Sequence, residues 1–208
     1  ERRTRLVRLL GDGDPMALVE RHGHIPLPPY IARADAPDDA SRYQTVYAEE
    51  RGSVAAPTAG LHFTPEVLAA VAARGVRRVD VLLHVGAGTF RPVEVDDPTA
   101  HVMHEEWYRV TAESAAALGA TRAAGGKVWA VGTTSMRTLE SAANPDGSVR
   151  AEARDTNLFI RPPYDFRVVD RLVTNFHLPK STLIMLVAAF AGYDLTMHAY
   201  ETAVREGY

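Results

Sequence analysis

The sequence predicts an α/β domain built on a mixed, largely parallel sheet with flanking helices. Strand-like and helix-like segments alternate along most of the 208 residues, with roughly 30 residues per strand–helix unit. Strand-like cores such as Val81–Leu83 are continuously apolar, which is typical of strands covered on both faces. Helices that connect such strands across a sheet favour parallel pairing.

Composition and charge exclude several classes of protein. The chain has no cysteine, which excludes disulfide bonds, thiolate catalysis and a cysteine-based zinc site. Its apolar run Leu183–Phe190 is too short to span a bilayer. The net charge of −3 gives no overall nucleic-acid signature, so RNA would have to bind at local basic patches, such as Arg74, Arg77 and Arg78. We expect a cytoplasmic monomer that has no membrane partner.

The first third of the chain is expected to hold short elements joined by an extended connector. Pro15 is compatible with the first turn of a helix, whereas the prolines within His24–Tyr30 force an extended chain. Tyr43, Val46 and Tyr47 recur at helical spacing. The predicted elements are a strand at Thr4–Leu10, a helix at Pro15–Arg21, the connector at His24–Tyr30, an acidic loop at Ala36–Ser41, and helices at Arg42–Glu50 and Thr64–Arg74.

Clear start and stop signals mark the later helices. Thr111 and Gly125 bracket one helix, and Gly192 ends another. The helix that ends at Gly192 is apolar on almost every face, so it is predicted to lie inside the protein. The predicted elements are strands at Val76–Val85, Thr89–Val93, Trp107–Val110, Lys127–Val131, Thr156–Ile160 and Arg171–Val173, helices at Ala112–Ala124, Met136–Ala143, Lys180–Phe190 and Leu195–Glu206, and a polar loop at Asn144–Arg154.

Polar and proton-handling side chains gather where three predicted strands end. His84 precedes a glycine loop, Gly86–Gly88, while Gly132–Arg137 and Thr174–His177 each follow another strand. Ligands of parallel α/β folds bind beyond the carboxyl ends of the strands, so we predict an active site at this edge. The segment Thr174–His177 also lies beside the start of the apolar helix, where unpaired N–H groups suit an anion or a polar substrate. The alternative there is a capped core helix with a satisfied histidine.

A metal site is not expected. His101, His104 and Glu106 could suggest one, because histidine and carboxylate are common metal ligands. However, their spacing is not that of HEXXH, and the segment is predicted to be extended rather than helical. Acid–base or hydrogen-bonding roles are favoured.

The turn Gly132–Ser135 offers hydroxyl and N–H groups that suit a phosphate, a carboxylate or a ribose. It lacks both the Walker lysine and the GxGxxG spacing, which disfavours a nucleoside triphosphate or a Rossmann dinucleotide. An ordinary helix N-cap is the alternative. Arg137 either pairs with Glu140, one turn away, or faces the ligand as a fixed cation.

Seven long runs of the sequence carry a resemblance that covers the chain from about residue 24 to its end. They are HIPLPPYI (His24–Ile31), RYQTVYA (Arg42–Ala48), GSVAAPTAGLHFT (Gly52–Thr64), HVGAGTFRPV (His84–Val93), HVMHEE (His101–Glu106), VGTTSMRTLE (Val131–Glu140) and TNFHLPKSTLIMLVAAFAG (Thr174–Gly192). Together they resemble the S-adenosylmethionine:tRNA ribosyltransferase-isomerases of queuosine biosynthesis. Pro163 departs from the glycine usual there, and Ala87 from the common leucine, but neither change removes a polar group.

The resemblance implies a small β-barrel domain inserted in a larger, barrel-like α/β domain. Residues 1–23 would then be the tail of the small β-barrel, and residues 24–208 would belong to the catalytic domain, without the N-terminal part of the family length. The resemblance also implies an activity. The ribosyl group of the co-substrate S-adenosylmethionine moves to the aminomethyl group of a 7-deazaguanine base in the tRNA anticodon loop, and rearranges to epoxyqueuosine as adenine and methionine leave.

That chemistry needs a base for the proton beside the sulfonium, an acid for adenine departure, and donors for the ribose and the carboxylate. The residues assigned to proton transfer are His62, His84, His104, Glu106 and His177. The residues assigned to substrate binding are Thr133, Thr134, Ser135, Arg137, Thr174 and Asn175. We expect them to converge on one pocket without a metal. The alternatives are another nucleoside or sugar-phosphate transferase or hydrolase, and a non-catalytic RNA-binding fragment.

Overall fold

The computed structural model describes residues 8, 10, 14–86, 93, 95 and 97–208. Some predictions fall outside these residues. The strand at Thr89–Val93 and most of the strand at Thr4–Leu10 do so, as does the glycine loop beyond Gly86. Much of the segment 1–23, expected to be the tail of a small β-barrel, lies outside them as well.

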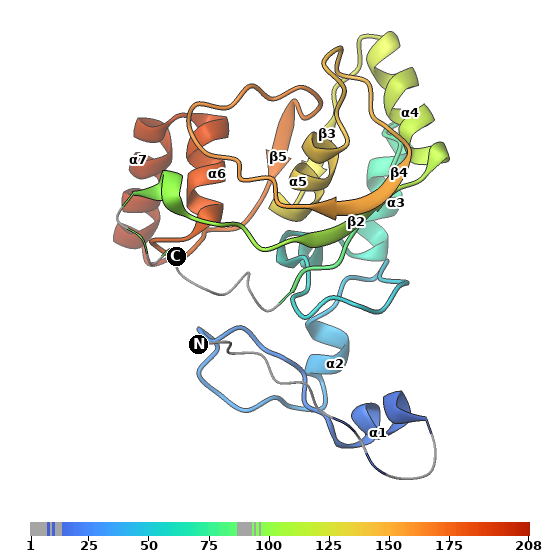
Figure 1. The fold of residues 1–208 in the computed structure, drawn as a ribbon, viewed down its shortest axis with the longest axis vertical. Coiled ribbons are helices and arrows are strands. Elements are labelled where there is room, and N and C mark those ends of the chain that lie inside the picture. Colours follow the sequence, from blue (N-terminus) through green and yellow to red (C-terminus); the bar gives the residue numbers. More distant parts are fainter. Residues whose placement is uncertain (1–7, 9, 11–13, 87–92, 94, 96) are drawn as a thin grey trace.

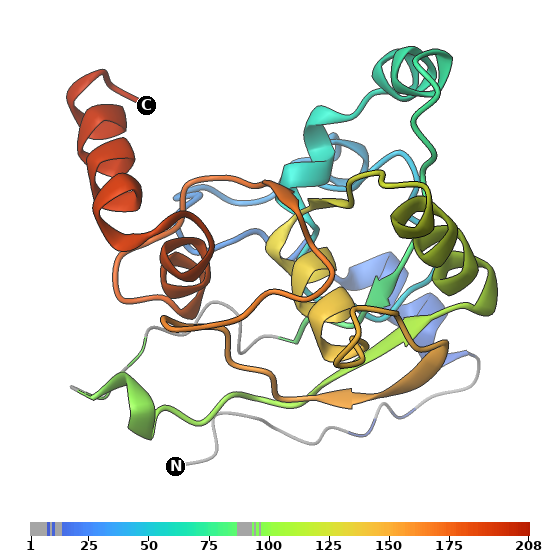
Figure 2. The same ribbon diagram turned by 90° about the horizontal axis from the view of Figure 1, so that it is seen from above.

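Helices and short strands alternate in the described part of the chain (Figures 1 and 2). The α-helices are α1 (Pro15–His22), α2 (Asp39–Arg42), α3 (Pro65–Ala73), α4 (Ala112–Ala123), α5 (Thr133–Ser141), α6 (Thr182–Ala191) and α7 (Tyr193–Arg205). Two 3-10 helices are η1 (Thr58–His62) and η3 (Pro98–Ala100). The strands are β1 (Leu82–Leu83), β2 (Glu106–Val110), β3 (Trp129–Val131), β4 (Glu152–Thr156) and β5 (Arg171–Val173). The mixed α/β class is confirmed.

The described strands form two separate sheets. β1, β2 and β4 form an antiparallel sheet in that order, with Glu106 opposite Thr156. β3 and β5 form a parallel pair, with Val131 opposite Val173. The expectation of a largely parallel sheet is therefore not confirmed. Two parallel strands need a crossover connection that brings the chain back to the same edge of the sheet. Among the described strands, only the segment between β3 and β5 makes such a crossover.

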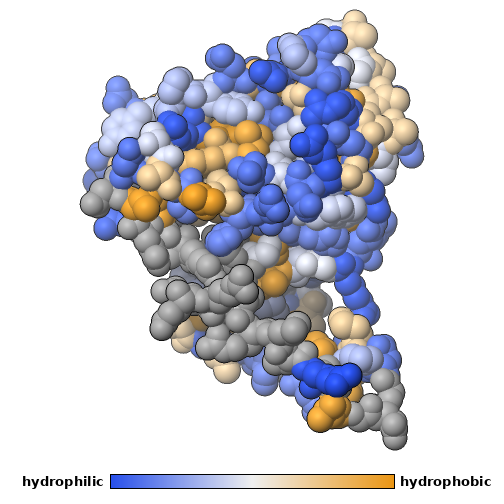
Figure 3. All heavy atoms as spheres, viewed as in Figure 1, coloured by the Kyte–Doolittle hydropathy of each residue, from blue (hydrophilic) through white to orange (hydrophobic). Residues whose placement is uncertain are grey.

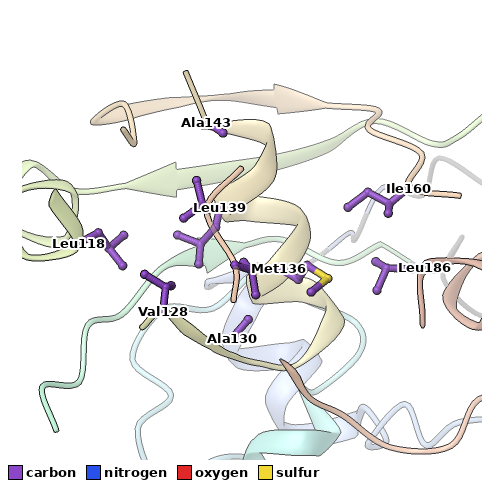
Figure 4. Close-up of a cluster of buried hydrophobic side chains, with 10 residues drawn as sticks. Leu118, Val128, Ala130, Met136, Leu139, Ala143, Ile160 and Leu186 are labelled. Carbon is purple, nitrogen blue, oxygen red and sulfur yellow. The ribbon is translucent and has the colours of Figure 1, made fainter. Parts of the chain in front are cut away.

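Helix α5 is the centre of the packing. Met136 and Leu139 enter a buried cluster with side chains of α4, β3 and α6 (Figure 4). Ala142, near the other end of α5, packs beneath the antiparallel sheet with Tyr108 and Val110. Full burial of a side chain such as Met or Leu contributes about 1.5–3 kcal/mol, so these contacts fix α5 firmly between the two sheets. The start of α5 is thereby held at the carboxyl edge of β3.

Side-chain caps define where several helices begin. The hydroxyl oxygens of Thr64, Thr111 and Ser181 each accept a backbone N–H three residues further along, at the starts of α3, α4 and α6. The capping oxygen satisfies one of the N–H groups that a helix start leaves unpaired. The predicted starts of these three helices are confirmed, as are the strand at Arg171–Val173 and the helix that begins at Pro15.

The region around Asp39 differs from the prediction. Residues expected to form a loop contain helix α2, whereas the helix predicted at Arg42–Glu50 is replaced by turns after Arg42. Both oxygens of the Asp39 carboxylate accept hydrogen bonds from Arg33, at 2.6 and 2.8 Å, and one also accepts the Ala36 N–H at 2.7 Å. These bonds fix the chain reversal that starts α2. The chain leaves helical geometry at Tyr43, so the later apolar spacing reflects turns.

Three further boundaries differ. β4 is Glu152–Thr156 rather than Thr156–Ile160, because it is an edge strand with mostly exposed side chains and no apolar pattern marks it. Regular pairing in the strand predicted at Val76–Val85 is confined to β1. Helix α5 begins before Met136, because Gly132, at φ 92°, turns the chain directly from β3 into the helix.

Helix α6 is less buried than its composition predicts. Among its ten residues only Leu186 is fully buried, since α6 and α7 lie together at one side of the molecule (Figure 1). α7 exposes Tyr193, Leu195 and Val204, and hydrophobic surface is visible on this side among polar residues (Figure 3). Within the described ranges, no single helix has the length and apolar character to cross a membrane; α6 and α7 meet that criterion only as a pair bent by 119°.

Candidate active site

The carboxyl ends of β3 and β5 bring two of the predicted polar clusters together. Val131 lies opposite Val173 in the parallel pair, and the Gly132 N–H donates to the Val173 carbonyl at 2.8 Å. Thr133, which follows Gly132, and Thr174, which follows Val173, therefore lie at the same edge of the sheet. This is the place where ligands bind in parallel α/β structures.

The start of α5 at this edge has no side-chain cap, because its N-cap residue is Gly132. Thr133 is buried and Thr134 half-buried. Ser135 donates its hydroxyl proton to the Val131 carbonyl at 2.8 Å, which ties the first turn of α5 to β3. The hydroxyl proton of Ser135 is therefore engaged in this bond, so Ser135 could only accept a hydrogen bond from a substrate.

The turn after β5 holds His177 between two hydroxyl groups. Its Nε2 forms a hydrogen bond with Thr174 Oγ1 at 3.1 Å, and its backbone N–H donates to the hydroxyl of Tyr200 on α7 at 2.9 Å. Phe176 packs edge-on against the Tyr200 ring, 5.0 Å between centroids. Burial lowers the pKa of His177 to about 4, because the charged imidazolium loses hydration inside the protein. The ring is therefore neutral at pH 7.

Asn175 connects this turn to the 3-10 helix η1. Its Oδ1 accepts a hydrogen bond from Thr58 Oγ1 at 3.1 Å, and its Nδ2 lies 3.3 Å from His62 Nε2. Thr58 and His62 are the first and last residues of η1. The fold thus joins His62 to the β5 turn, although the two lie 113 positions apart in the sequence.

Glu106 and Arg137 form a buried ion pair on the flank of α5. Their side chains are 8 % and 9 % exposed, and Arg137 Nη1 donates to Glu106 Oε2. Arg137 Nε donates to the Leu158 carbonyl at 3.3 Å, and Glu106 Oε1 accepts the Gly86 N–H at 3.3 Å. Arg137 Nη2 is buried without a hydrogen-bond partner in the described part of the chain. The pair links β2, and the segment that follows β1, to α5.

The alternative pairing of Arg137 with Glu140 does not occur. The Glu140 carboxylate accepts the backbone N–H groups of Arg167, Val168 and Val169, at 2.9 to 3.0 Å. Glu140 therefore holds the chain just before β5, a structural role for which the sequence carries no local signal.

His84 and His104 have different surroundings. The His84 ring stacks on Trp107, 5.2 Å between centroids, and lies against the backbone of Gly52, where an added Cβ would stand 2.1 Å from the ring. His104 is exposed. Over the residues described, no group of three or more His, Asp or Glu side chains could hold a metal ion.

The similarity of this chain to known proteins shows its family. A family model described as "Queuosine biosynthesis protein" matches residues 1–208, the whole chain. The chain belongs to the queuosine biosynthesis protein family. Three relatives named S-adenosylmethionine:tRNA ribosyltransferase-isomerase come from Rhodospirillum rubrum, Symbiobacterium thermophilum and Ralstonia pickettii. They are 60 %, 60 % and 58 % identical to this chain, over 93 %, 92 % and 92 % of its length.

The match covers only part of each relative. The chain spans 56 %, 55 % and 53 % of the three, or about half the length of the curated relatives it matches. A crystal structure of an S-adenosylmethionine tRNA ribosyltransferase from Thermotoga maritima is also similar, with a TM-score of 0.57 and 47 % identity. That similarity covers 71 % of this chain and 46 % of the other.

The structure of this family member groups some of the predicted site residues. Hydrogen bonds in the turn after β5 join Thr174 to His177 and Asn175 to His62. Thr133, Thr134 and Ser135 form the first turn of α5, at the same edge of the β3–β5 pair. Glu106 and Arg137 bind one another further along α5, and His84 packs on Trp107. Convergence of all of them on one pocket remains a prediction.

Two hollows in the described surface lie outside these groups. The larger, about 500 Å³, adjoins the carboxyl end of α5 and includes Tyr108, Glu140 and Tyr164. The other, about 430 Å³, lies between Phe176 and α7 and includes His198 and Tyr208. Neither contains a predicted site histidine.

Thr58 and Tyr200 were not among the predicted site residues. Thr58 lies in η1 and Tyr200 in α7, and each is joined to the site by a tertiary contact.

Proposed function

We propose that this chain is the catalytic part of an enzyme that transfers and isomerises the ribosyl group of S-adenosylmethionine. The acceptor is the 7-aminomethyl-7-deazaguanine base of tRNA, and the products are epoxyqueuosine-tRNA, adenine and methionine. The observation that carries the proposal is the match of the whole chain to the queuosine family, with relatives at 56–60 % identity that bear this enzyme name. The same names support S-adenosylmethionine as co-substrate, tRNA as partner, and hence the cytoplasm as compartment.

The β3–β5 edge supplies groups that suit this chemistry. The reaction needs a proton acceptor for the carbon beside the sulfonium, a donor for the leaving adenine, and groups that hold ribose. His177 is neutral at pH 7, so it has an unprotonated ring nitrogen with which to accept a proton or a hydrogen bond. The hydroxyls of Thr133, Thr134 and Thr174 at the same edge suit the ribose. The uncapped start of α5 suits a carboxylate, because its N–H groups and dipole favour negative charge.

The tRNA would present one base out of its stack. Sequence-specific RNA recognition uses unpaired bases, which can stack on exposed aromatic rings. Phe176 is 57 % exposed and lies next to Asn175, so its ring is a candidate for such stacking at the mouth of the site. The phosphate contacts would be electrostatic and would weaken as salt rises.

The decisive experiment measures adenine release from S-adenosylmethionine by the protein that carries this chain at the length of its relatives. Release that depends on tRNA bearing the aminomethyl-deazaguanine base, together with epoxyqueuosine in that tRNA, is the expected result. Release without tRNA would indicate a nucleoside hydrolase, and tRNA binding without release would indicate a non-catalytic RNA-binding protein.

His177→Gln tests the site in the same assay. We expect a loss of about 100-fold or more in rate, the size typical for removal of an acid–base group. His22→Gln is the matched control, because His22 is exposed on α1 and forms none of the contacts of the β3–β5 edge. Equal rates in the two variants would remove His177 from the reaction.

A further inference from the structure

A chain of two hydrogen bonds joins Thr58, Asn175 and His62. Thr58 Oγ1 donates to Asn175 Oδ1 at 3.1 Å, and Asn175 Nδ2 meets His62 Nε2 at 3.3 Å. Both bonds use the same side-chain amide. The structure places the amide oxygen toward Thr58 and the NH₂ group toward His62. The reversed amide would instead donate to Thr58 Oγ1 and accept from a protonated His62 Nε2, because a hydroxyl can both donate and accept.

The amide contact fixes the protonation of the His62 ring. An NH₂ group can only donate, so the ring nitrogen that faces it must be the unprotonated one. Neutral imidazole carries one proton, which then resides on Nδ1. With the amide oriented as in the structure, protonation of Nε2 would set two donors against each other, and the amide would have to turn to keep the contact.

We propose that Asn175, oriented by Thr58, holds His62 in the Nδ1–H tautomer, so that the ring offers a fixed hydrogen-bond donor to the bound nucleoside. His62 is exposed and stands at the edge where β3 and β5 end, which leaves its ring accessible to a ligand. Thr58 acts through two other side chains and is a positioning residue. The nucleoside as ligand rests on the proposed function, whereas the tautomer does not.

A fixed donor has a defined advantage at such a site. A histidine that exchanges between tautomers has its proton on Nδ1 for only part of the time. Binding that needs the Nδ1–H donor must then select that form. An Asn175 amide that is held at both ends removes this cost before the substrate arrives.

The test is ¹⁵N NMR of the histidine side chains in the 208-residue chain at about pH 8, where histidine is ordinarily neutral. Couplings from the ring C–H protons distinguish a protonated nitrogen from an unprotonated one, and comparison with His62→Gln assigns the His62 signals. We expect the proton of His62 on Nδ1. A proton on Nε2, or equal populations of both forms, would overturn the proposal.

Two variants at position 58 separate positioning from packing. Thr58→Val keeps the shape and removes the hydroxyl, so the amide is free to turn and a second His62 tautomer should appear. Thr58→Ser keeps the hydroxyl and should restore the single Nδ1–H form. If Thr58→Val leaves the tautomer unchanged, Thr58 has no positioning role.

Asn175→Asp should produce the opposite tautomer of His62. A carboxylate accepts only, so it should draw the proton to Nε2 and reverse the signature. The His177 signals serve as the internal reference for folding, because His177 bonds to Thr174 and Tyr200 instead. If adenine release fails while the Nδ1–H form is observed, the proposed function is wrong and the tautomer stands. If adenine is released while the proton of His62 is on Nε2, the proposed function stands and the tautomer proposal is wrong.

Discussion

At the scale of single residues, the structure separates histidines that the sequence could only group. His177 is neutral beside Thr174, His62 faces an amide, and His84 is stacked on Trp107. The sequence could predict them as candidates, because histidines that follow strands and flank glycine loops point to a site. It could not predict Thr58 or Tyr200, since each contributes through a contact between segments far apart in the chain.

The half-buried ring of His177 makes stability depend on pH. Its pKa is lowered to about 4 in the folded protein, against about 6.5 for an unfolded histidine, so the unfolded chain binds its proton first as the pH falls. The stability that this group contributes is fully present above about pH 6.5 and is lost as the pH falls toward 4. We expect the free energy of unfolding, measured by urea titration, to fall across this window.

His177→Gln should flatten that dependence, because glutamine does not titrate. The comparison is with His22→Gln, an exposed site whose substitution should leave the slope as in the wild type. A wild-type slope that persists in His177→Gln would assign the dependence to other groups.

At the scale of elements, local chemistry predicts helices better than strands in this chain. The starts of α3, α4 and α6 follow from hydroxyl caps that can be read in the sequence. β4 could not be predicted, because its residues Glu-Ala-Arg-Asp-Thr are polar and it becomes a strand only by pairing with β2. The helix predicted at Arg42–Glu50 was wrong because Asp39 fixes a turn earlier in the chain.

The cap of α6 can be tested at Ser181, whose Oγ accepts the Ile184 N–H at 3.3 Å. Ser181→Ala should lower the free energy of unfolding by about 1 kcal/mol, because the N–H loses its acceptor. Ser181→Asp is the matched control and should be near neutral, since aspartate also caps and favours the helix dipole. Urea unfolding monitored by circular dichroism gives both values, and equal losses in the two variants would contradict a capping role.

At the scale of the whole molecule, the pairing of strands is what the sequence predicts least well. Apolar strand cores indicate burial but not the partner, and the antiparallel sheet is assembled from segments on either side of α5. The Glu106–Arg137 pair joins these parts, because Glu106 belongs to β2 and Arg137 to α5. Neither residue reveals this partner in the sequence, from which Glu106 is assigned to proton transfer and Arg137 to substrate binding.

The contribution of the Glu106–Arg137 ion pair between β2 and α5 can be tested by substitution of Arg137. Arg137→Met should lower the free energy of unfolding by about 3–5 kcal/mol, since removal of one partner leaves Glu106 buried and uncompensated. Arg109→Met is the matched control, because Arg109 pairs with Glu50 at the surface, where an ion pair contributes about 0–1 kcal/mol. A double variant, Arg137→Met with Glu106→Leu, should recover much of the loss. Similar losses in Arg137→Met and Arg109→Met would show that the buried pair has no special role.

The parallel pairing of β3 with β5 also has a consequence for how the protein acquires its site. Trp129 pairs with Arg171, 42 positions later, so this contact closes a long loop, whereas the helices between them form from local contacts. Contacts between distant positions form slowly, because the entropy of closing the loop opposes them. The polar edge therefore exists only once this closure is complete, and a chain with α4 and α5 already folded still lacks it. Substrate binding should accordingly lag behind the gain of helical signal during refolding.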